Sequence, residues 1–539
     1  MPTGAQVIVA QLEHAGVEVC FGLPGVHNLA LWEALRDSDI RLVGVRHEQA
    51  AAYAADGYAR SSGRLGVALT TTGPGAANTL GAVGEAWAAR SPILVIATDI
   101  PSTLRQPGVY RGILHETTDQ AAMFAPVVKS VHRALTLETA PQAAAAAMRD
   151  ALAAPTRPVY LEVATDLLAA ELPVASSEPA PGPMPPLAGA LDAAAARLDA
   201  AAKPLVWAGS GARDAGAEVG RLAERLAAPV LTTYGAAGLL PPAHPCLVGM
   251  PPHAESAGTL WDEADLVLAI GSDLDGVQTQ NFAMPQPAAL LAINLDPVDA
   301  AKNYRVDTLL EGDAARLTAA LTERVADRGG LDDVAHRLHE VRAQACSTLD
   351  ERALRFLDAI ERALPDDAIV VCDMCIPGYW LGGFYSPAAP RRLQIPLGWG
   401  TLGYAFPAAL GAALADVGPV VAVSGDGGFL FACGELATMA QEQIPLTAVI
   451  VDDGGYGMLR YDQDVHGDER YGVDLHTPDF AALAAAFGVA AEVVDGLADD
   501  FGEALARHVL EPGPSVLIAQ TPEPLVPPPN TSPNWYRRR

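Results

Sequence analysis

Apolar residues recur along the chain in two alternating patterns, one typical of helices and one of buried strands. Residues 4–16, 28–37 and 49–61 place apolar side chains three and four positions apart, which predicts amphipathic helices. Short apolar runs such as "LGVALTTTGPG" at 65–75 and "PVYLEVATD" at 158–166 predict strands. Alternation of this kind implies parallel strands joined by crossover helices, so we expect doubly wound α/β domains.

The same alternation returns in a middle and a third part of the chain. At 539 residues the chain is too long for one core, since single domains usually hold ~100 to 200 residues. The proline-rich stretch "SSEPAPGPMPPLAG" at 176–189 marks the first boundary. We expect three α/β domains with doubly wound parallel sheets. The expected order is a first domain at 1–170, a linker at 171–185, a central domain at 186–330, a helical connection at 331–351, a third domain at 352–523 and a tail at 524–539.

The charge balance excludes some classes of partner. Formal net charge is −29, from 35 basic and 64 acidic side chains, whereas binding to a phosphate backbone needs clustered Lys and Arg. We therefore expect no nucleic-acid partner. No stretch reaches the ~18 uninterrupted apolar residues of a membrane span, and the N-terminal helix pattern is unlike a signal peptide. A cytoplasmic protein without a membrane partner is the expectation.

Two of the six cysteines, Cys372 and Cys375 in "VVCDMC", have the CxxC spacing of a redox or zinc site. No second pair accompanies them. We interpret them as a reduced structural pair.

Two aspartates follow neighbouring strand patterns of the third domain. The predicted order is a strand at 419–424, the turn "GDGG" at 425–428, a helix at 433–442 and a strand at 446–451. In a right-handed parallel unit of this kind, Asp426 and Asp453 both leave the carboxyl edge of the sheet. Neighbouring strands lie ~4.8 Å apart, and carboxylates that close repel each other unless a cation lies between them. Each element alone could be a plain turn or a solvated loop, but the strand contexts favour a shared site.

A Mg²⁺ ion bridging a diphosphate fits this edge. Mg²⁺ prefers oxygen ligands and usually completes its octahedron with substrate phosphate and water. The glycines of "GDGG" let backbone N–H groups approach a phosphate closely.

The residues around these aspartates resemble the thiamine diphosphate binding motif, a GDG followed at a similar distance by an Asn pair. The matching stretch is "GDGGFLFACGELATMAQEQIPLTAVIVDDGGYGML" at 425–459. In the first domain, "FGLPGVHNLALWEAL", "VRHEQAAAYAADGYAR" and "TTTGPGAANTLGAVGEAW" are similar to the pyrimidine-binding domain of the acetolactate synthase and 2-oxo acid decarboxylase family. The resemblance covers essentially the whole chain, in the order pyrimidine, central and diphosphate domain.

The resemblance implies roles for many residues. Glu48 would hydrogen-bond the aminopyrimidine ring of thiamine diphosphate, and Asp426, Asp453 and the Gly455 carbonyl would bind Mg²⁺. Further residues implied to contact the cofactor are Pro74, Asn78, Met374, Gly400, Leu402, Gly425, Gly427, Gly428, Tyr456, Gly457 and Met458. In such enzymes Glu48 and the metal site come from different subunits, which implies a homodimer or homotetramer with sites at the subunit interface.

The chain departs from the family pattern at three places. Asp453 stands where relatives carry Asn; we expect Mg²⁺ binding to survive, with a cation such as Arg460 offsetting the added charge. Asp462 replaces the Trp that housekeeping acetolactate synthases carry four residues past Met458. The FAD-anchoring pattern of their central domain is not evident in "IGSDLDGVQTQNF" at 270–282, so FAD is not supported.

Residues of the substrate pocket are less visible. His27 and His115 fall where relatives place substrate-pocket and proton-transfer residues, and histidine suits proton transfer near neutral pH. Gln120 would help to line the same pocket. A lone histidine is more often structural, so both interpretations stay open.

Other stretches, "FGLPGVHNL", "LHETTDQ" and "GWGTLGYAFPA", are similar to decarboxylases of 5-guanidino-2-oxopentanoate, the 2-oxo acid of arginine. The acidic segment "RYDQDVHGDER" at 460–470 could attract a cationic substrate tail or be a solvated loop. The C-terminal "NTSPNWYRRR" could be a lid with Trp535 as its plug, or a frayed end.

The function implied by the resemblance is decarboxylation of a 2-oxo acid through an enamine, which is then protonated or ligated to a second carbonyl compound. The alternative is cleavage or ligation of C–C bonds like that of benzaldehyde lyase or 2-hydroxyacyl-CoA lyase, with a 2-oxo acid or aldehyde as substrate. A non-catalytic paralogue that binds thiamine diphosphate would lack the activating carboxylate, and Glu48 is present.

Overall fold

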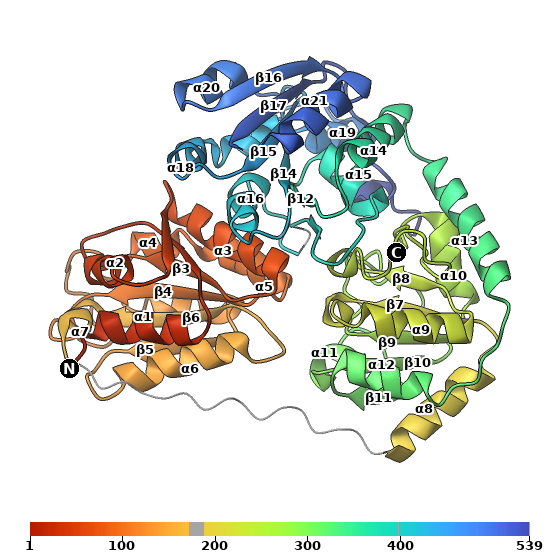
Figure 1. Ribbon diagram of the computed structural model, residues 1–539, viewed down its shortest axis with the longest axis horizontal. Coiled ribbons are helices and arrows are strands. Elements are labelled where there is room, and N and C mark those ends of the chain that lie inside the picture. Colours follow the sequence, from red (N-terminus) through yellow and green to blue (C-terminus); the bar gives the residue numbers. More distant parts are fainter. Residues whose placement is uncertain (172–187, 397, 512, 538–539) are drawn as a thin grey trace.

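Three α/β domains, each built on a parallel sheet, make up the computed structural model of the chain (Figure 1). It describes residues 1–171, 188–396, 398–511 and 513–537. The predicted fold class is confirmed, because every pairing between named strands is parallel and each sheet draws its strands from one of the three predicted segments. Nearly all of the predicted linker at 171–185 lies outside the described residues. No helix among the described residues is both long and apolar enough to span a bilayer.

The first domain has a six-stranded sheet in the order β2-β1-β3-β4-β6-β5. Its strands are β1 (Val19–Gly22), β2 (Arg41–Gly44), β3 (Gly66–Thr70), β4 (Ile93–Asp99), β5 (Ser130–Ala134) and β6 (Val159–Ala164). Its helices are α1 (Gly4–His14), α2 (Leu29–Arg36), α3 (Glu48–Ser62), α4 (Pro74–Ala77), α5 (Leu80–Ala88), α6 (Ala140–Leu152) and α7 (Thr165–Ala169), with the 3₁₀ turns η1 (Ala121–Met123) and η2 (Ala125–Val127).

Alternate residues of its central strands enter two different cores. Val95 and Ala97 of β4 face the core shared with α3, whereas Leu94 and Ile96 face the core beneath α1 and α6. Helices therefore cover both faces of the sheet, which is why β4 is apolar and buried along its whole length.

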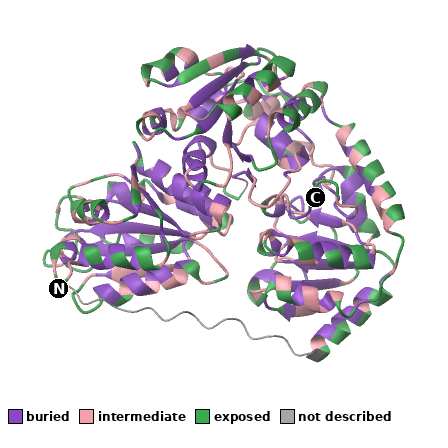
Figure 2. Cartoon of the chain, in the orientation of Figure 1, coloured by how far each residue is buried: buried purple, intermediate pink, exposed green. Residues whose placement is uncertain are grey.

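The central domain has a five-stranded sheet in the order β11-β10-β9-β7-β8. Its strands are β7 (Pro204–Ala208), β8 (Val230–Thr232), β9 (Leu266–Ile270), β10 (Leu290–Asn294) and β11 (Thr308–Glu311). Its helices are α8 (Ala188–Ala200), α9 (Gly216–Leu226), α10 (Glu255–Glu263), α11 (Pro297–Ala301) and α12 (Ala314–Thr322), with η3 (Ser210–Ala212) and η4 (Tyr234–Ala236). The connection to the third domain is α13 (Leu331–Cys346), whose outer face is exposed while most strands are buried (Figure 2).

The third domain has a six-stranded sheet in the order β13-β12-β14-β15-β17-β16. Its strands are β12 (Ile369–Cys372), β13 (Leu393–Gln394), β14 (Val420–Gly425), β15 (Leu446–Asp452), β16 (Ala490–Asp495) and β17 (Ser515–Gln520). Its helices are α14 (Glu351–Ala363), α15 (Ile376–Phe384), α16 (Ala405–Ala413), α17 (Asp426–Leu430), α18 (Leu436–Gln441), α19 (Gly457–His466), α20 (Phe480–Ala486) and α21 (Asp499–Leu510), with η5 (Cys433–Glu435) and η6 (Ser532–Asn534).

The helix predicted at 433–442 is split into η5 and α18. Glu435, at the junction, turns its carboxylate to the first domain, where it accepts from the backbone N–H groups of Arg46 and His47 at 2.9 and 3.0 Å. The interdomain contact gives the local irregularity a physical reason.

Helices α3 and α16 pack closely and merge the cores of the first and third domains. The contact is possible because glycine replaces a side chain at each crossing point: a Cβ at Gly57 would overlap the carbonyl oxygen of Ala408, and one at Gly411 would overlap that of Ala54. Removing the side chains lets the two backbones touch and holds the domains together over a short distance.

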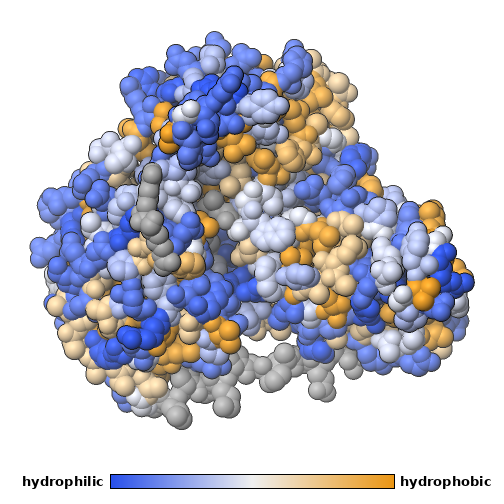
Figure 3. All heavy atoms as spheres, turned by 180° about the vertical axis from the view of Figure 1, so that it is seen from behind, coloured by the Kyte–Doolittle hydropathy of each residue, from blue (hydrophilic) through white to orange (hydrophobic). Residues whose placement is uncertain are grey.

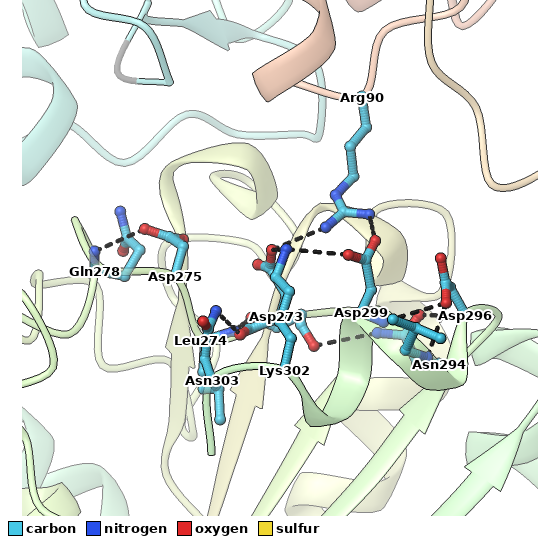
Figure 4. Close-up of polar contacts among 12 residues, drawn as sticks. Arg90, Asp273, Leu274, Asp275, Gln278, Asn294, Asp296, Asp299, Lys302 and Asn303 are labelled. Carbon is cyan, nitrogen blue, oxygen red and sulfur yellow. Dashed lines mark hydrogen bonds and ion pairs between the residues drawn. The ribbon is translucent and has the colours of Figure 1, made fainter. Parts of the chain in front are cut away.

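Charged contacts join the first domain to the central one (Figure 4). Arg90, just after α5, lies between Asp273 and Asp299 and pairs with both, at 2.9 Å to Asp273. Lys302 pairs with the same two carboxylates at 2.7 and 3.0 Å. Burial would raise the pKa of Asp299, but the cations outweigh this and hold it at about 2. Asp299 is thus ionised at neutral pH.

We expect Gly57→Ala to destabilise the α3–α16 contact, because the new Cβ has no space and the facing group is rigid backbone. A loss of about 1 to 3 kcal/mol is expected, seen as a lower midpoint in thermal unfolding. Gly189→Ala is the matched control, since it lies in α8 with nothing within 4 Å of a new Cβ. Equal midpoints for Gly57→Ala and the wild type would contradict the close approach of the helices.

Candidate active site

All the residues predicted in the third domain except Asp426 line one cavity of about 210 Å³ at the carboxyl edge of its sheet, and Asp426 lies in sequence between two of them, Gly425 and Gly427. The predicted residues that line it are Met374, Gly400, Leu402, Gly425, Gly427, Gly428, Asp453, Gly455, Tyr456, Gly457 and Met458. Tyr379 and Leu525 also line it and were missed in the sequence, because they lie outside the quoted motifs; Leu459, the last residue of the stretch 425–459, lines it too.

The strand register brings the two predicted metal residues to this edge. Gly425 at the end of β14 pairs with Val451 of β15, so Asp426 and Asp453 leave neighbouring strands at almost the same level. Asp426 begins α17, and Asp453 follows the last residue of β15. The predicted juxtaposition of the two strands is confirmed.

Both carboxylates are held in surroundings that disfavour their charge. Asp426 is fully buried; its Oδ1 accepts from the Gly427 N–H at 2.6 Å, and its Oδ2 has no partner among the described residues. Burial, and then the charge of Asp453, raises the pKa of Asp426 to about 7. Burial also raises the pKa of Asp453. A cation between the two would relieve both effects.

Arg460 offsets the charge of Asp453, as expected from the sequence. Its Nη2 lies 3.4 Å from Asp453 Oδ1, and its Nη1 donates to the Asp453 carbonyl at 2.9 Å. The guanidinium is buried and also pairs with Asp474 at 3.1 Å. The Arg460 charge therefore opposes the rise in the Asp453 pKa.

The residues present fit a Mg²⁺-diphosphate. A Cβ at Gly457 would overlap Asp453 Oδ2, and one at Gly427 would lie 2.7 Å from the ring of Tyr456, so glycines keep the cradle open. The Gly455 carbonyl accepts from the Gly457 N–H at 3.1 Å and keeps a second lone pair. No group of three or more His, Cys, Asp or Glu forms a metal cage within the described ranges. Two carboxylates and a carbonyl leave the other positions to phosphate and water, as Mg²⁺ prefers.

Asp373 organises the cradle and was not predicted. It follows β12, is buried, and accepts from the N–H groups of Met374 at 2.8 Å and Gly403 at 3.0 Å. A Cβ at Gly428 would lie 2.9 Å from its Oδ2. Burial raises the pKa of Asp373 to about 6, against the effect of these bonds. Its place after a strand at the same sheet edge was the one available signal.

Cys372 and Cys375 are free thiols at the end of β12 and before α15. Burial raises the pKa of both thiols, so the thiolate needed for redox chemistry is disfavoured. The structure favours the interpretation as a reduced structural pair. The carbonyl of Asp452 accepts from Thr521, and nothing in the structure explains its side chain.

The second group of predicted residues lies in the first domain. Glu48 begins α3 and is buried, with Oε2 accepting from Asn78 Nδ2 at 2.9 Å. A Cβ at Gly75 would lie 3.3 Å from Glu48 Oε1, so the turn that begins α4 at Pro74 lies against the same carboxylate. Glu48, Asn78 and the Pro74 turn therefore form one unit.

His27 and His115 are brought together although 88 positions separate them (115 minus 27). Their ring centroids lie 5.2 Å apart, and the Nδ1 atom of each is buried without a partner among the described residues. Burial, and then His115, lowers the pKa of His27. His115 has a φ of 67°, a strained conformation for a non-glycine residue, which favours a functional role.

Gln120 is buried and directs its amide inward, toward the protein. Its Oε1 accepts from the Gly73 N–H at 2.6 Å, and its Nε2 donates to the Thr98 carbonyl and the Tyr160 hydroxyl. These bonds hold the turn before Pro74. They favour a positioning role over direct contact with substrate.

No residue of the first domain lines the cavity of the third. The unit around Glu48 and the cavity around Asp453 are thus two half-sites within one chain.

The acidic segment at 460–470 and the C-terminal tail are more ordered than their sequences indicate. Asp464 pairs with Arg470 at 2.6 Å in solvent. The Trp535 ring stacks on that of His253 in the central domain, with ring centroids 5.5 Å apart, and its Nε1–H donates to the Asn530 carbonyl. The tail is held through residue 537, and Leu525, not Trp535, lines the cavity.

In the central domain, the glycines of "GSG" at 209–211 have a packing role. A Cβ at Gly211 would lie 2.8 Å from Gly271 Cα, and one at Gly209 would overlap the Gly271 carbonyl. A larger cavity of about 460 Å³ lies beside them, between the domains and apart from the cavity around Asp453.

Comparisons with known proteins agree with this arrangement. Three family descriptions match the chain: thiamine pyrophosphate enzyme, N-terminal TPP binding domain at 2–123, central domain at 191–321, and C-terminal TPP binding domain at 375–519. A probable 2-ketoarginine decarboxylase of Pseudomonas aeruginosa is 39% identical over 90% of this chain and 89% of its own length. A probable acetolactate synthase large subunit of Methanocaldococcus jannaschii is 31% identical over 97% of this chain and 93% of its own.

Asp453→Asn is expected to weaken Mg²⁺ binding by about tenfold, because the site loses one of its two anionic ligands. Calorimetric titration of Mg²⁺ in the presence of thiamine diphosphate would measure it. Asp474→Asn is the control. Asp474 is the other acidic partner of Arg460, is exposed and lies outside the cavity. If Asp453→Asn binds Mg²⁺ as the wild type does, the extra charge has no role.

Proposed function

The chain belongs to the thiamine pyrophosphate enzyme family, and from this premise we propose that it uses thiamine diphosphate and Mg²⁺ to decarboxylate a 2-oxo acid. The observation that carries the proposal is the pair of carboxylates at the edge of a glycine-lined cavity, Asp426, which is buried, and Asp453, whose side chain is 10% exposed. Arg460 offsets only Asp453, so placing two like charges this close remains costly, and a Mg²⁺ ion between them would reduce that cost.

The relatives support a 2-oxo acid substrate. One is named a probable 2-ketoarginine decarboxylase, and several are named acetolactate synthases. The overall reaction we propose converts a 2-oxo acid and a proton into an aldehyde and CO₂.

The residues of the two half-sites would divide the work. Thiamine diphosphate, when bound, supplies the nucleophilic carbon that adds to a 2-oxo acid and accepts the electrons left by CO₂. Asp426, Asp453 and the Gly455 carbonyl would hold the metal, and the N–H groups of the glycine turn would face the diphosphate. Asn78 fixes Glu48 through Oε2, which leaves Oε1 to hold a proton shared with the cofactor ring.

His27 and His115 favour protonation of the product over ligation to a second carbonyl compound. Each has a buried ring nitrogen without a partner among the described residues, and such a nitrogen can hold and deliver a proton. The lowered pKa of His27 makes it a stronger acid once protonated.

The complete site requires a second subunit in this proposal. Large apolar side chains flank both half-sites and are more than half exposed: Val26 and Leu114 beside the histidines, and Trp399 and Phe431 beside the cavity. In the view from behind, hydrophobic surface gathers over the third domain and the adjoining first domain (Figure 3). Exposed apolar surface next to an incomplete site fits a two-fold interface that joins one chain's Glu48 to another's cavity.

A panel of 2-oxo acids should release CO₂ with the wild type, and Glu48→Gln should lower turnover by about 10³-fold while thiamine diphosphate still binds. CO₂ release and fluorescence quenching by the cofactor measure the two effects. Glu116→Gln is the control. Glu116 is another carboxylate of the first domain, and it accepts hydrogen bonds from the backbone N–H groups of Arg111 and Ile113. Release of CO₂ from no member of the panel would refute the function, and full activity of Glu48→Gln would refute its mechanism.

Mixing two inactive variants tests the shared site. A dimer of one Glu48→Gln and one Asp426→Ala chain places both defects in one site and leaves the other intact. Coexpression should restore about a quarter of wild-type activity, because half of the dimers are mixed and each holds one intact site. Mixtures as inactive as either variant alone would show that Glu48 and Asp426 of the same chain work together.

A further inference from the structure

Asp462 lies on the helix that borders the cofactor cavity. Met458 and Leu459, in the first turn of α19, line that cavity. Residues three and four positions apart share one face of a helix, so Asp462 lies one turn further along the same face.

Asp462 differs from the other acids of its segment. Asp464 is exposed and paired with Arg470, and Asp468 and Glu469 are exposed. Asp462 is half-buried, and its Oδ1 is fully buried without a partner among the described residues. His466, one turn further along the helix, hydrogen-bonds the Asp462 carbonyl at 2.7 Å instead of its carboxylate. Asp462 therefore differs from the exposed acids around it in having a partly buried carboxylate.

The Asp462 carboxylate also lies near the wall of the cavity. Tyr379 lines the cavity, and the charge of Asp462 contributes to the raised pKa of its phenol. Burial in turn raises the pKa of Asp462. An anion in these surroundings gains most from a cation that arrives with the substrate.

We propose that Asp462 selects 2-oxo acids with a cationic, guanidinium-like end. The inference rests on the proposed function and adds the substrate class. The reacting carbonyl would lie near Met458, an aliphatic chain would pass along Met458 and Leu459, and the cation would reach Asp462 one helical turn, ~5.4 Å, further on. A guanidinium can bind a carboxylate through two parallel hydrogen bonds.

The same carboxylate would reject other substrates. A neutral tail leaves the buried oxygen unpaired, and a second carboxylate on the substrate is repelled. Both effects act on binding, so they should change KM more than kcat.

The test compares 5-guanidino-2-oxopentanoate with the neutral 2-oxohexanoate in wild type, Asp462→Asn and Asp464→Asn. The wild type should favour the guanidino substrate, and Asp462→Asn should lower the ratio of the two kcat/KM values by about 10- to 100-fold, mainly through KM. Asp464→Asn, which removes an exposed acid of the same helix, should keep the wild-type ratio. Thiamine diphosphate affinity and the thermal midpoint verify that each variant is folded.

Binding of an unreactive analogue separates this inference from the proposed function. Calorimetry with 5-guanidinopentanoate and hexanoate needs no turnover. Tighter binding of the guanidino acid, lost in Asp462→Asn only, would support the inference even if no 2-oxo acid released CO₂. A wild type with no preference, or a preference that Asp462→Asn retains, would overturn it and leave the proposed function standing.

Discussion

Repulsion between Asp426 and Asp453 is the constraint around which the third domain is arranged. Parallel pairing of β14 and β15 forces both carboxylates to one edge, and burial makes their charges harder to hold. Arg460 offsets Asp453, while Asp426 keeps one oxygen without a partner among the described residues. Burial, and then the charge of Asp453, raises the pKa of Asp426 to about 7, so a proton on Asp426 can relieve the repulsion near neutral pH. In the proposed function, a bound cation would relieve the same repulsion.

The glycines that open this cradle work together with those that join the domains. Asp373 ties the turn at Gly403 to the strand edge, and α16 begins immediately after that turn. Because Gly57 and Gly411 let α16 touch α3, the position of the cavity is linked mechanically to the helix that carries Glu48. The Arg90 contacts then fix the first domain to the central one. The position of each half-site therefore depends on contacts between whole domains.

Local patterns were sufficient to predict the fold class and the pairing of Asp426 with Asp453 at one sheet edge, whereas the other residues of the cavity wall were implied by the family resemblance. Strand periodicity and the spacing of Asp426 and Asp453 depend on neighbours in sequence, so they are visible without a structure. Asp373 and the interaction of Gln120 with Gly73 depend on contacts between distant segments. The division of the helix at 433–442 has the same origin, since the Glu435 carboxylate accepts a hydrogen bond from the backbone of Arg46 in the first domain. The resemblance could place His27 and His115 in one pocket, but only the fold shows their rings in contact.

Aspartate at position 453, which precedes α19, and aspartate at 462, within α19, stand where the family pattern has Asn and Trp and add two negative charges. Arg460, between them in sequence, is buried against Asp453 and leaves Asp462 without that cation. Arg460 is also held by Asp474 and by the Asp453 carbonyl, and residues two positions apart point to different sides of a helix, so Arg460 is not placed to pair with Asp462. The two acids therefore differ in their surroundings: Arg460 offsets the charge of Asp453, whereas Asp462 keeps a buried carboxylate oxygen without a partner among the described residues, open to a cation from outside the protein.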